Sequence, residues 1–191
     1  MKLFLDDHFS QVIQERKAVF ADNDFLGLIY HDEELLKEIL TLLSGKRIYI
    51  YPFTEFEFLR EVFDPKIRNL KEQFIDKSIF GHIKEEIHMR ILPRIIKNAM
   101  LLSKIYAHQR RGGDKITSSF VDLFLAALLM FLSEKIVLIT GNKKDFPSCV
   151  FDILSILNIE QEDGNMRAIC VIKFNQEKFN SCNGQLMKLE T

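Results

Sequence analysis

The stretch that decides the fold is K-I-V-L-I-T-G-N-K-K-D-F, residues 135–146. Its first half is an uninterrupted apolar run rich in β-branched residues, which is typical of a strand buried on both faces of a parallel sheet. Gly141 then opens a turn that leads to Asn142 and Asp145. Because open α/β sheets place their sites where strands end, this turn is a candidate functional site.

A second apolar strand has the same layout: K-A-V-F-A, residues 17–21, runs directly into Asp22-Asn23-Asp24. Two more strands are expected at R-I-Y-I-Y, residues 47–51, and at A-I-C-V-I-K-F, residues 168–174. Segments with helical patterning separate these strands. The alternation predicts the α/β class, as a three-layer α/β/α sandwich with a mostly parallel central sheet.

The length of 191 residues suits one domain with a full core. We expect residues 1–16 to be an N-terminal extension with a small helix, residues 17–180 to form the domain, and residues 181–191 to be a loose tail. Residues 64–119 indicate a helical insertion, kinked at Pro93 and ended by Gly112-Gly113. A further helix is expected near residues 151–157.

The composition describes a globular chain whose formal net charge is only −1. The molecule as a whole therefore does not attract a polyanion, and any binding of nucleic acid depends on local cations or on a metal ion. Cys149, Cys170 and Cys182 form no C-x-x-C pair, which argues against structural zinc and a disulfide framework and favours a reducing compartment. The longest apolar stretch, residues 121–132, contains Asp122 and is too short to span a bilayer. We expect a cytoplasmic protein without a membrane partner.

Four acidic residues stand at the edges of apolar runs in four separate parts of the chain: Asp22, Glu57, Asp122 and Asp145. Carboxylates in apolar surroundings are costly to desolvate unless a cation meets them. If the fold gathers these four, their mutual repulsion favours the binding of a divalent ion such as Mg²⁺ or Mn²⁺. Alternatively each has an ordinary structural role, as a helix cap, a first-turn acid, a turn cap or a solvated helix residue.

In sequence and order, these motifs resemble the PIN-domain nucleases, and among them the VapC-type toxin ribonucleases. The resemblance is carried by D-N-D-F-L from Asp22, by Thr54 with Glu57-Phe58, by D-L-F-L-A-A from Asp122, and by T-G-N-K-K-D-F from Thr140. It covers roughly residues 18–152. The first sixteen residues and the long segment 64–119 depart from the family pattern, and two further departures lie in the site. Asn142 stands where relatives often have Asp, so either Asn142 or Asp145 is the fourth ligand, and Asp24 replaces the commoner Asn or Ser.

The resemblance implies a PIN-like fold and an Mg²⁺- or Mn²⁺-dependent endoribonuclease that hydrolyses RNA. It implies metal ligands at Asp22, Glu57, Asp122 and Asp145, a catalytic contribution from Asn142, and supporting roles for Asp24 and Thr140. An antitoxin protein and a second copy of the chain in a homodimer are the candidate partners. The alternative is a PIN-like module that has lost catalysis and binds RNA or protein.

Candidate RNA-binding cations lie in three places. Lys143 and Lys144 flank the acidic turn, and Arg60 follows Glu57 by one helical turn. On the long helical segment, Arg90, Arg94 and Lys97 fall on one stripe, which can track a phosphate backbone. That stripe is also what the solvent-facing side of an ordinary amphipathic helix looks like.

Two other classes explain less of the sequence. The pair Asp6-Asp7 suggests a phosphoacceptor receiver domain, but it precedes a helix-like stretch and no acceptor Asp stands at the end of a later strand. The D-x-D spacing of Asp22 and Asp24 suits a haloacid-type phosphatase, which leaves Glu57 and the helix at Asp122 without a role.

Overall fold

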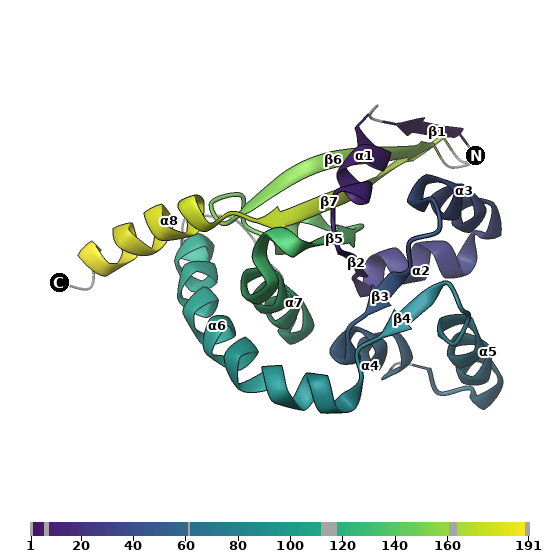
Figure 1. Ribbon diagram of the computed structural model, residues 1–191, viewed down its shortest axis with the longest axis horizontal. Coiled ribbons are helices and arrows are strands. Elements are labelled where there is room, and N and C mark those ends of the chain that lie inside the picture. The colour runs from purple at the N-terminus through teal and green to yellow at the C-terminus, as the bar shows by residue number, and fades with distance from the viewer. Residues whose placement is uncertain (1, 6–7, 61, 112–117, 161–163, 190–191) are drawn as a thin grey trace.

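The computed structural model describes residues 2–5, 8–60, 62–111, 118–160 and 164–189. Within these residues, seven strands form one sheet in the order β1-β6-β7-β5-β2-β3-β4, with helices around it (Figure 1). The strands are β1 (Lys2–Leu5), β2 (Ala18–Ala21), β3 (Ile48–Ile50), β4 (Phe80–His82), β5 (Ile136–Thr140), β6 (Phe151–Glu160) and β7 (Met166–Phe174). The helices are α1 (Phe9–Gln14), α2 (Asn23–His31), α3 (Glu33–Leu43), α4 (Pro52–Arg60), α5 (Pro65–Ile75), α6 (Glu85–Arg111), α7 (Phe120–Leu132) and α8 (Gln176–Leu189), with 3-10 turns η1 (Ser133–Lys135) and η2 (Lys143–Asp145).

The sheet has a parallel half and an antiparallel half. Strands β5, β2, β3 and β4 pair in parallel, whereas β7 pairs antiparallel with β5, β6 with β7, and β1 with β6. Because β6 thereby runs in the same direction as β5, five of the seven described strands share one direction. The predicted α/β class with a mostly parallel sheet is confirmed.

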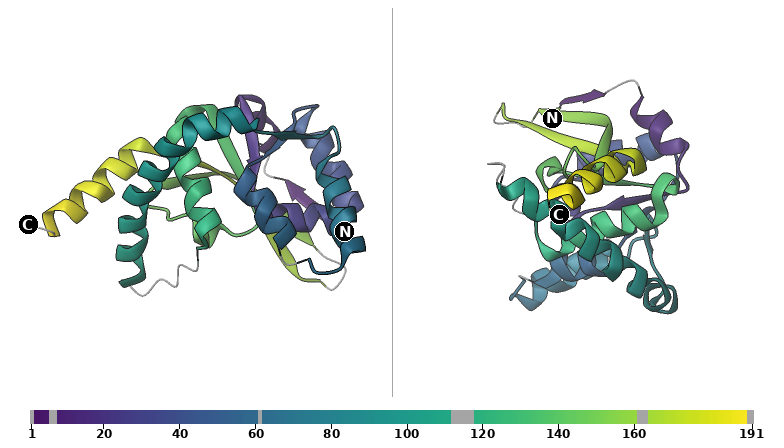
Figure 2. Two further views of the ribbon diagram at one scale, coloured as in Figure 1. Left: turned by 90° about the horizontal axis from the view of Figure 1, so that it is seen from below. Right: turned by 90° about the vertical axis from the view of Figure 1, so that its left-hand side faces the viewer.

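Successive strand residues face two separate cores, one on each side of the sheet. Val19 and Ala21 of β2 face the first core, with α1, α2, α3 and α5, while Phe20 faces the second, with α6, α7 and the start of α8. Figures 1 and 2 show these helices on opposite sides of the strands. Helices on both faces are the arrangement that a three-layer sandwich requires.

The described residues near both chain ends take part in the fold. The small helix expected within residues 1–16 is α1, but this segment is not a mere extension, and residues 181–189 of the expected loose tail belong to α8. β1 adds an edge strand beside β6, and α1 buries Phe9 and Ile13 in the first core. At the other end, α8 is helical through Leu189 because Phe179, Cys182 and Leu186 form an apolar stripe against the second core.

The helix expected near residues 151–157 is wrong, because this segment is β6. Its residues alternate in burial from Ser155 onward, and a register shift between Ile153 and Ser155 interrupts the alternation at its start. Leu154 and Ile156 are partly buried on the opposite faces, so both sides of the strand carry apolar residues. The sequence therefore lacks the simple alternation by which a half-buried strand is recognised.

The segment at residues 64–119 is largely helical, as expected, but it is not simply an insertion. Between α5 and α6 lies β4, which pairs in parallel with β3 and forms the edge of the sheet. Pro93 lies inside α6, and Figure 1 shows that α6 bends along its course. Gly112-Gly113 and Asp6-Asp7 lie outside the described residues. Of the helices described, none combines the length and apolar character needed to cross a bilayer.

Candidate functional site

The predicted acidic residues lie around the carboxyl ends of the central parallel strands. Since β2 pairs in parallel with both β5 and β3, the carboxyl ends of these three strands lie side by side. Asp22 follows β2 directly, and its N–H donates to the Ile139 carbonyl of β5 at 3.1 Å. Thr140 ends β5, and α4, which carries Glu57, starts just after β3. The carboxyl ends of these strands are therefore where the rule for α/β sheets places a site.

Asp22 is buried, with 3% of its surface exposed, and is the N-cap of α2. Its Oδ1 accepts a hydrogen bond from the Phe25 N–H at 2.7 Å. Burial raises the pKa of Asp22 to about 8, although hydrogen bonds from Thr140 and Phe25 act in the opposite direction, and the charges of Asp24 and Asp122 raise it further. A carboxyl group in this environment holds a proton at neutral pH unless a cation replaces it.

Asp122 occupies the third position of α7 and forms a reciprocal capping box with Ser119. Ser119 is thus the N-cap of α7. Burial raises the pKa of Asp122, the two hydrogen bonds with Ser119 lower it, and the charge of Asp24 raises it. Asp122 therefore has a structural role as part of the cap, and its pKa is also raised by the charge of Asp24 in α2.

Glu57 lies half-buried on α4, with its Oε1 3.8 Å from an Nη atom of Arg60. Burial is the main cause that raises the pKa of Glu57, and the negative charges of Asp122 and Asp24 add to it. Arg60 and a hydrogen bond with Ser119 lower the pKa. Ser119 thus contacts both Glu57 and Asp122, which brings α4 and the start of α7 together at the site.

We call Asp22, Asp24, Glu57 and Asp122 the acidic cluster. The charge of Asp24 raises the pKa of each of the other three, and the charge of Asp122 raises those of Asp22 and Glu57. A methyl group built on Gly141 would lie 3.3 Å from the Asp24 Cβ, so the turn after β5 packs directly against Asp24. Asp24, expected only in support, is the member that acts on all the others.

Asp145 and Asn142 form the neighbouring part of the site. The Asn142 side-chain amide donates to Asp145 Oδ2 at 2.7 Å, and the Asn142 backbone N–H donates to Thr140 Oγ1 at 2.9 Å. Asp145 is buried, with 7% of its surface exposed. Asn142 and Asp145, the two alternatives for the fourth ligand, therefore belong to one hydrogen-bonded turn. Thr140 links this turn to the acidic cluster, because it hydrogen-bonds both Asn142 and Asp22.

Tyr106, on α6, is a site residue that the sequence did not indicate. Its hydroxyl donates to the Asp145 carbonyl oxygen at 2.8 Å. Burial raises the pKa of Tyr106 well above its ordinary value, and the charges of Asp122 and Asp145 raise it further. Tyr106 thus lies between the acidic cluster and the Asp145 turn. It stands in a long helical segment without a motif, so no sequence signal marks it.

The donor set fits a hard divalent ion in its chemistry. It consists of carboxylate oxygens whose proton affinity is raised by burial and by one another, which are the conditions under which a cation replaces a proton. Within the described ranges, however, no group of three or more His, Cys, Asp or Glu side chains is arranged to hold a metal ion as it stands.

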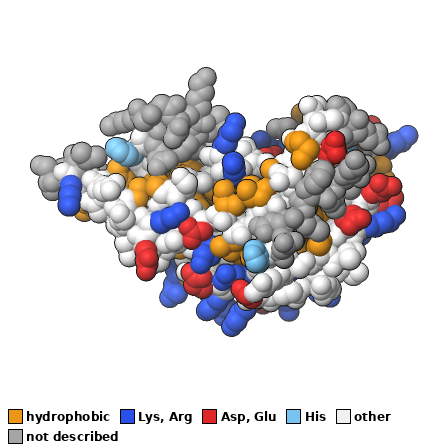
Figure 3. Space-filling model, turned by 90° about the horizontal axis from the view of Figure 1, so that it is seen from above, with side chains coloured by type: hydrophobic (Ala, Val, Ile, Leu, Met, Phe, Trp, Pro, Cys, Tyr) orange, Lys and Arg blue, Asp and Glu red, His pale blue; other side chains and the backbone are white. Residues whose placement is uncertain are grey.

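The candidate RNA-binding cations are distributed unevenly. Lys143 and Lys144 are exposed on η2 beside the site, and Arg60 is paired with Glu57. Arg90, Arg94 and Lys97 are all exposed on α6, and the Arg94 guanidinium also lies 5.9 Å from the centre of the Phe131 ring. All three cations of the predicted stripe therefore face solvent. On the face drawn in Figure 3, described Lys and Arg side chains are interspersed with Asp, Glu and hydrophobic ones.

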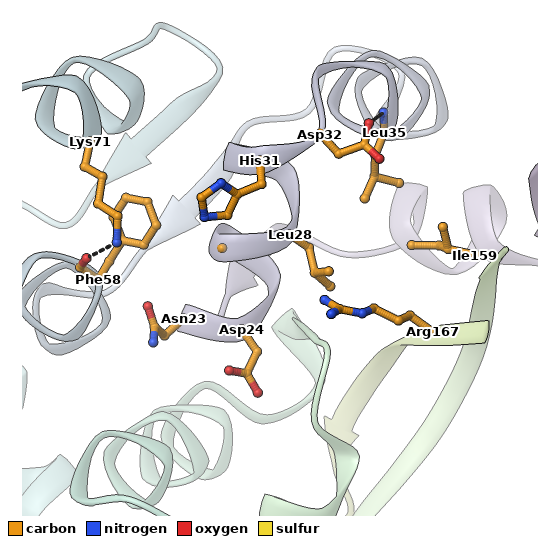
Figure 4. Close-up of a pocket in the computed structure, with 11 residues that line it drawn as sticks. Asn23, Asp24, Leu28, His31, Asp32, Leu35, Phe58, Lys71, Ile159 and Arg167 are labelled. Atoms are coloured by element: carbon orange, nitrogen blue, oxygen red, sulfur yellow. Dashed lines mark hydrogen bonds between the residues drawn. The ribbon is translucent and has the colours of Figure 1, made fainter. Parts of the chain in front are cut away.

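A pocket of about 550 Å³ adjoins the acidic cluster on the solvent side of α2. Asn23 and Asp24 belong to its lining, and Figure 4 shows Lys71 of α5 and Arg167 of β7 on opposite sides of α2. The Lys71 ammonium donates to the Phe58 carbonyl at 2.8 Å and lies 4.2 Å from the centre of the Phe58 ring. The remaining lining residues are Gly27, Leu28, His31, Asp32, Leu35, Phe58 and Ile159.

No protein-family model matches this chain, and no curated protein matches it at a significant level.

Proposed function

We propose that this protein is a metal-dependent endoribonuclease with a PIN-like site. The observation that carries the proposal is that charges within the acidic cluster, at the carboxyl ends of the parallel strands, raise the pKa values of Asp22, Glu57 and Asp122. The choice of RNA as substrate, and of the PIN-like family, rests on the sequence resemblance around Asp22, Glu57, Asp122 and Thr140.

Asp22, Asp24, Glu57 and Asp122 would hold the ion, with Asp145 and Asn142 completing the site from the η2 turn. When bound, Mg²⁺ or Mn²⁺ supplies the positive charge that acidifies a water molecule and stabilises the scissile phosphate. Ser119 orients the Asp122 carboxylate through its N–H to Oδ2, a 2.6 Å hydrogen bond. Thr140 and the Phe25 N–H orient Asp22 in the same way. These hydrogen bonds fix the orientation of the two carboxylates, as the partners of metal ligands commonly do.

The pocket over α2 is where one nucleotide of a single-stranded RNA would lie next to the acidic cluster. Its volume falls within the range that ligand pockets usually have. Leu28, Leu35 and Phe58 would offer apolar contact for a base. Arg167, and Lys71 once it releases the Phe58 carbonyl, would supply positive charge for phosphate oxygens. The Asp32 carboxylate caps α3 through the Leu35 N–H at 2.8 Å, so part of its negative charge is already compensated.

A second candidate is a PIN-like module that binds RNA or protein without cleaving it. The absence of a tight three-donor group among the described residues favours this alternative. Under it, the acidic residues serve as helix caps, as Asp22 and Asp122 do in the structure.

One experiment separates the two functions. The purified protein is incubated with a labelled single-stranded RNA and Mn²⁺, with and without a chelator, and both cleavage and binding are measured. The nuclease proposal expects cleavage that the chelator abolishes and that Asp122→Asn removes. RNA binding that the chelator leaves unchanged, with no cleavage under any condition, would support the module.

We further propose, from the resemblance alone, a cytoplasmic toxin that has an antitoxin partner and forms a homodimer. Sedimentation of the purified chain tests the homodimer, which predicts a species of twice the chain mass. The antitoxin proposal predicts that a small open reading frame for a DNA-binding protein adjoins the gene and that its product abolishes RNA cleavage.

A further inference from the structure

Cys149 and Cys182 are 33 residues apart in sequence, but the fold brings their sulfur atoms to 3.4 Å from each other. Cys149 lies in the short segment between η2 and β6, and Cys182 lies in the second turn of α8. The remaining thiol, Cys170, is buried within β7 with 1% of its surface exposed. The sequence spacing gave no sign of this pair, because only the docking of α8 creates it.

The pair sits where α8 leaves the body of the molecule. Just before it, the Lys178 ammonium donates to the Ser148 carbonyl at 3.2 Å and forms an ion pair with Asp152 at 2.8 Å. Phe179 is buried in the second core. Beyond the pair, Met187 is exposed, and Figures 1 and 2 show the end of α8 projecting away from the other elements.

The geometry of the two thiols suits a covalent link. A disulfide has its sulfur atoms about 2.05 Å apart, so the two sulfurs need to approach by only about 1.4 Å. Both residues are partly exposed, which gives a small oxidant access to them. A disulfide forms without large backbone movement only where the two cysteines already lie close together, and the sulfurs of Cys149 and Cys182 do.

We propose that Cys149 and Cys182 are a site of oxidation by low-molecular-weight disulfides, such as oxidised glutathione, and that the resulting bond fastens α8 to the body. The thiolate of one cysteine attacks the small disulfide, which releases one small thiol and leaves a mixed disulfide on the protein. The thiolate of the other cysteine then attacks the protein sulfur of that mixed disulfide and releases the second small thiol. The protein pair is oxidised by two electrons, the small disulfide is reduced by two, and the two thiol protons go to the released thiols.

The order of the two attacks follows from the surroundings of Cys149. Burial, and then the hydrogen bond and charge of Cys182, raise the pKa of Cys149 to about 12. A thiol with a raised pKa forms little thiolate at neutral pH. Cys149 is therefore the second cysteine to react, after Cys182 has formed the mixed disulfide.

The test uses the full chain, in buffers that range from reduced to oxidised glutathione, followed by intact mass spectrometry and non-reducing peptide mapping. The wild type and the control Cys170→Ser are expected to lose the mass of two hydrogen atoms and to yield one peptide that joins residues 149 and 182. Cys149→Ser is expected to accumulate a glutathione adduct on Cys182 instead. Hydrogen exchange in α8 is expected to slow on oxidation of the wild type and to be unchanged in Cys149→Ser.

Three outcomes would overturn the proposal. The first is a wild type that gains glutathione on both cysteines and never forms the internal bond. The second is a cross-link that joins two chains or involves Cys170. The third is an internal bond that leaves hydrogen exchange in α8 unchanged, which would remove the fastening role. None of these readouts depends on cleavage of RNA.

Discussion

Ser119 and Asp122 hold each other through two hydrogen bonds: the Asp122 N–H donates to Ser119 Oγ at 3.2 Å, and the Ser119 N–H donates to Asp122 Oδ2 at 2.6 Å. This box begins α7, yet the same Asp122 carboxylate raises the pKa values of Asp22 and Glu57. The structural and the chemical interpretation of Asp122 are thus compatible, and only experiments that measure stability and chemistry together can separate them.

The first prediction compares Asp122→Asn with Ser119→Ala. An Asn at position 122 can still accept from the Ser119 N–H, so the unfolding free energy should change by less than about 1 kcal/mol. RNA cleavage should fall by more than about 100-fold. Replacing a residue that only hydrogen-bonds a metal ligand typically lowers activity by about 10- to 100-fold, so a larger loss is expected for a ligand itself. Ser119→Ala should instead lose about 1 kcal/mol of stability and keep measurable cleavage. Chemical unfolding and a cleavage assay on both variants check this, and equal cleavage by wild type and Asp122→Asn would contradict it.

The second prediction concerns the pH dependence of Asp22. In the folded protein its pKa is raised to about 8 from 3.8, so between these values the folded state binds more protons than the unfolded state. The wild type should therefore lose stability as pH rises from about 4 to about 8, by a few kcal/mol at most. Asp22→Asn does not titrate and keeps the cap to the Phe25 N–H. Its stability advantage over the wild type should grow across the same window, as measured by urea unfolding at several pH values.

Saturating Mn²⁺ provides the control for this pH effect. A cation beside Asp22 favours the carboxylate, so the fall in wild-type stability should shrink when the metal is present. In Asp22→Asn, the dependence of the unfolding free energy on pH should change little when Mn²⁺ is added. A wild-type slope that Mn²⁺ leaves untouched would indicate that the ion does not bind near Asp22.

The third prediction concerns Tyr106, which is argued to position the Asp145 turn. Tyr106→Phe removes the hydroxyl that donates to the Asp145 carbonyl and should cost about 1 to 2 kcal/mol of stability. Because the turn carries Asn142 and Asp145, the KM for Mn²⁺ in RNA cleavage should rise while kcat at saturating metal stays within about 10-fold of wild type. A variant with lower stability and an unaltered metal dependence would show that Tyr106 is purely structural.

The fourth prediction uses Gly27, at the floor of the pocket over α2. A Cβ built on Gly27 meets no atom within 4 Å, and Gly27 lines the pocket, so a larger side chain at this position is expected to extend into it. Gly27→Phe should bind single-stranded RNA at least about 10-fold more weakly, with no loss of stability. Gly27→Ala is the matched control: it should bind normally and be up to about 1 kcal/mol more stable. Fluorescence anisotropy in the presence of chelator measures the binding, and equal affinities for the two variants would exclude the pocket as the RNA path.

The sequence predicted the parallel strands β2, β3 and β5 and also the antiparallel strand β7. β2 and β5 are uninterrupted apolar runs that end in polar turns, so local pattern alone identifies them. β6 could not be identified in this way, because it packs apolar residues on both faces and its partner β1 comes from the far end of the chain. β4 is a three-residue edge strand containing Gly81, too short for any periodicity to register.

The candidate site was predictable where a motif and a strand end coincide, as at Asp22 and Thr140. The capping role of Ser119 was within reach, since Ser119 and Asp122 have the spacing of a capping box. Tyr106 and the central position of Asp24 depend on how α6 and the β5 turn pack, which no local pattern encodes. The same is true of Cys149 and Cys182, which only the position of α8 brings together.

The most direct test of the acidic cluster is titration of the protein with Mn²⁺ at pH 7 by calorimetry, in buffers of different ionisation enthalpy. A metal site at Asp22 predicts binding that releases about one proton per ion, because the ion displaces the proton held by Asp22. Asp22→Asn should release none, Asp122→Asn should bind more weakly, and the control Asp64→Asn, which alters the exposed cap of α5, should match the wild type. Mn²⁺ binding of equal strength in the wild type and Asp122→Asn, or no binding by either, would contradict a metal site built from these carboxylates.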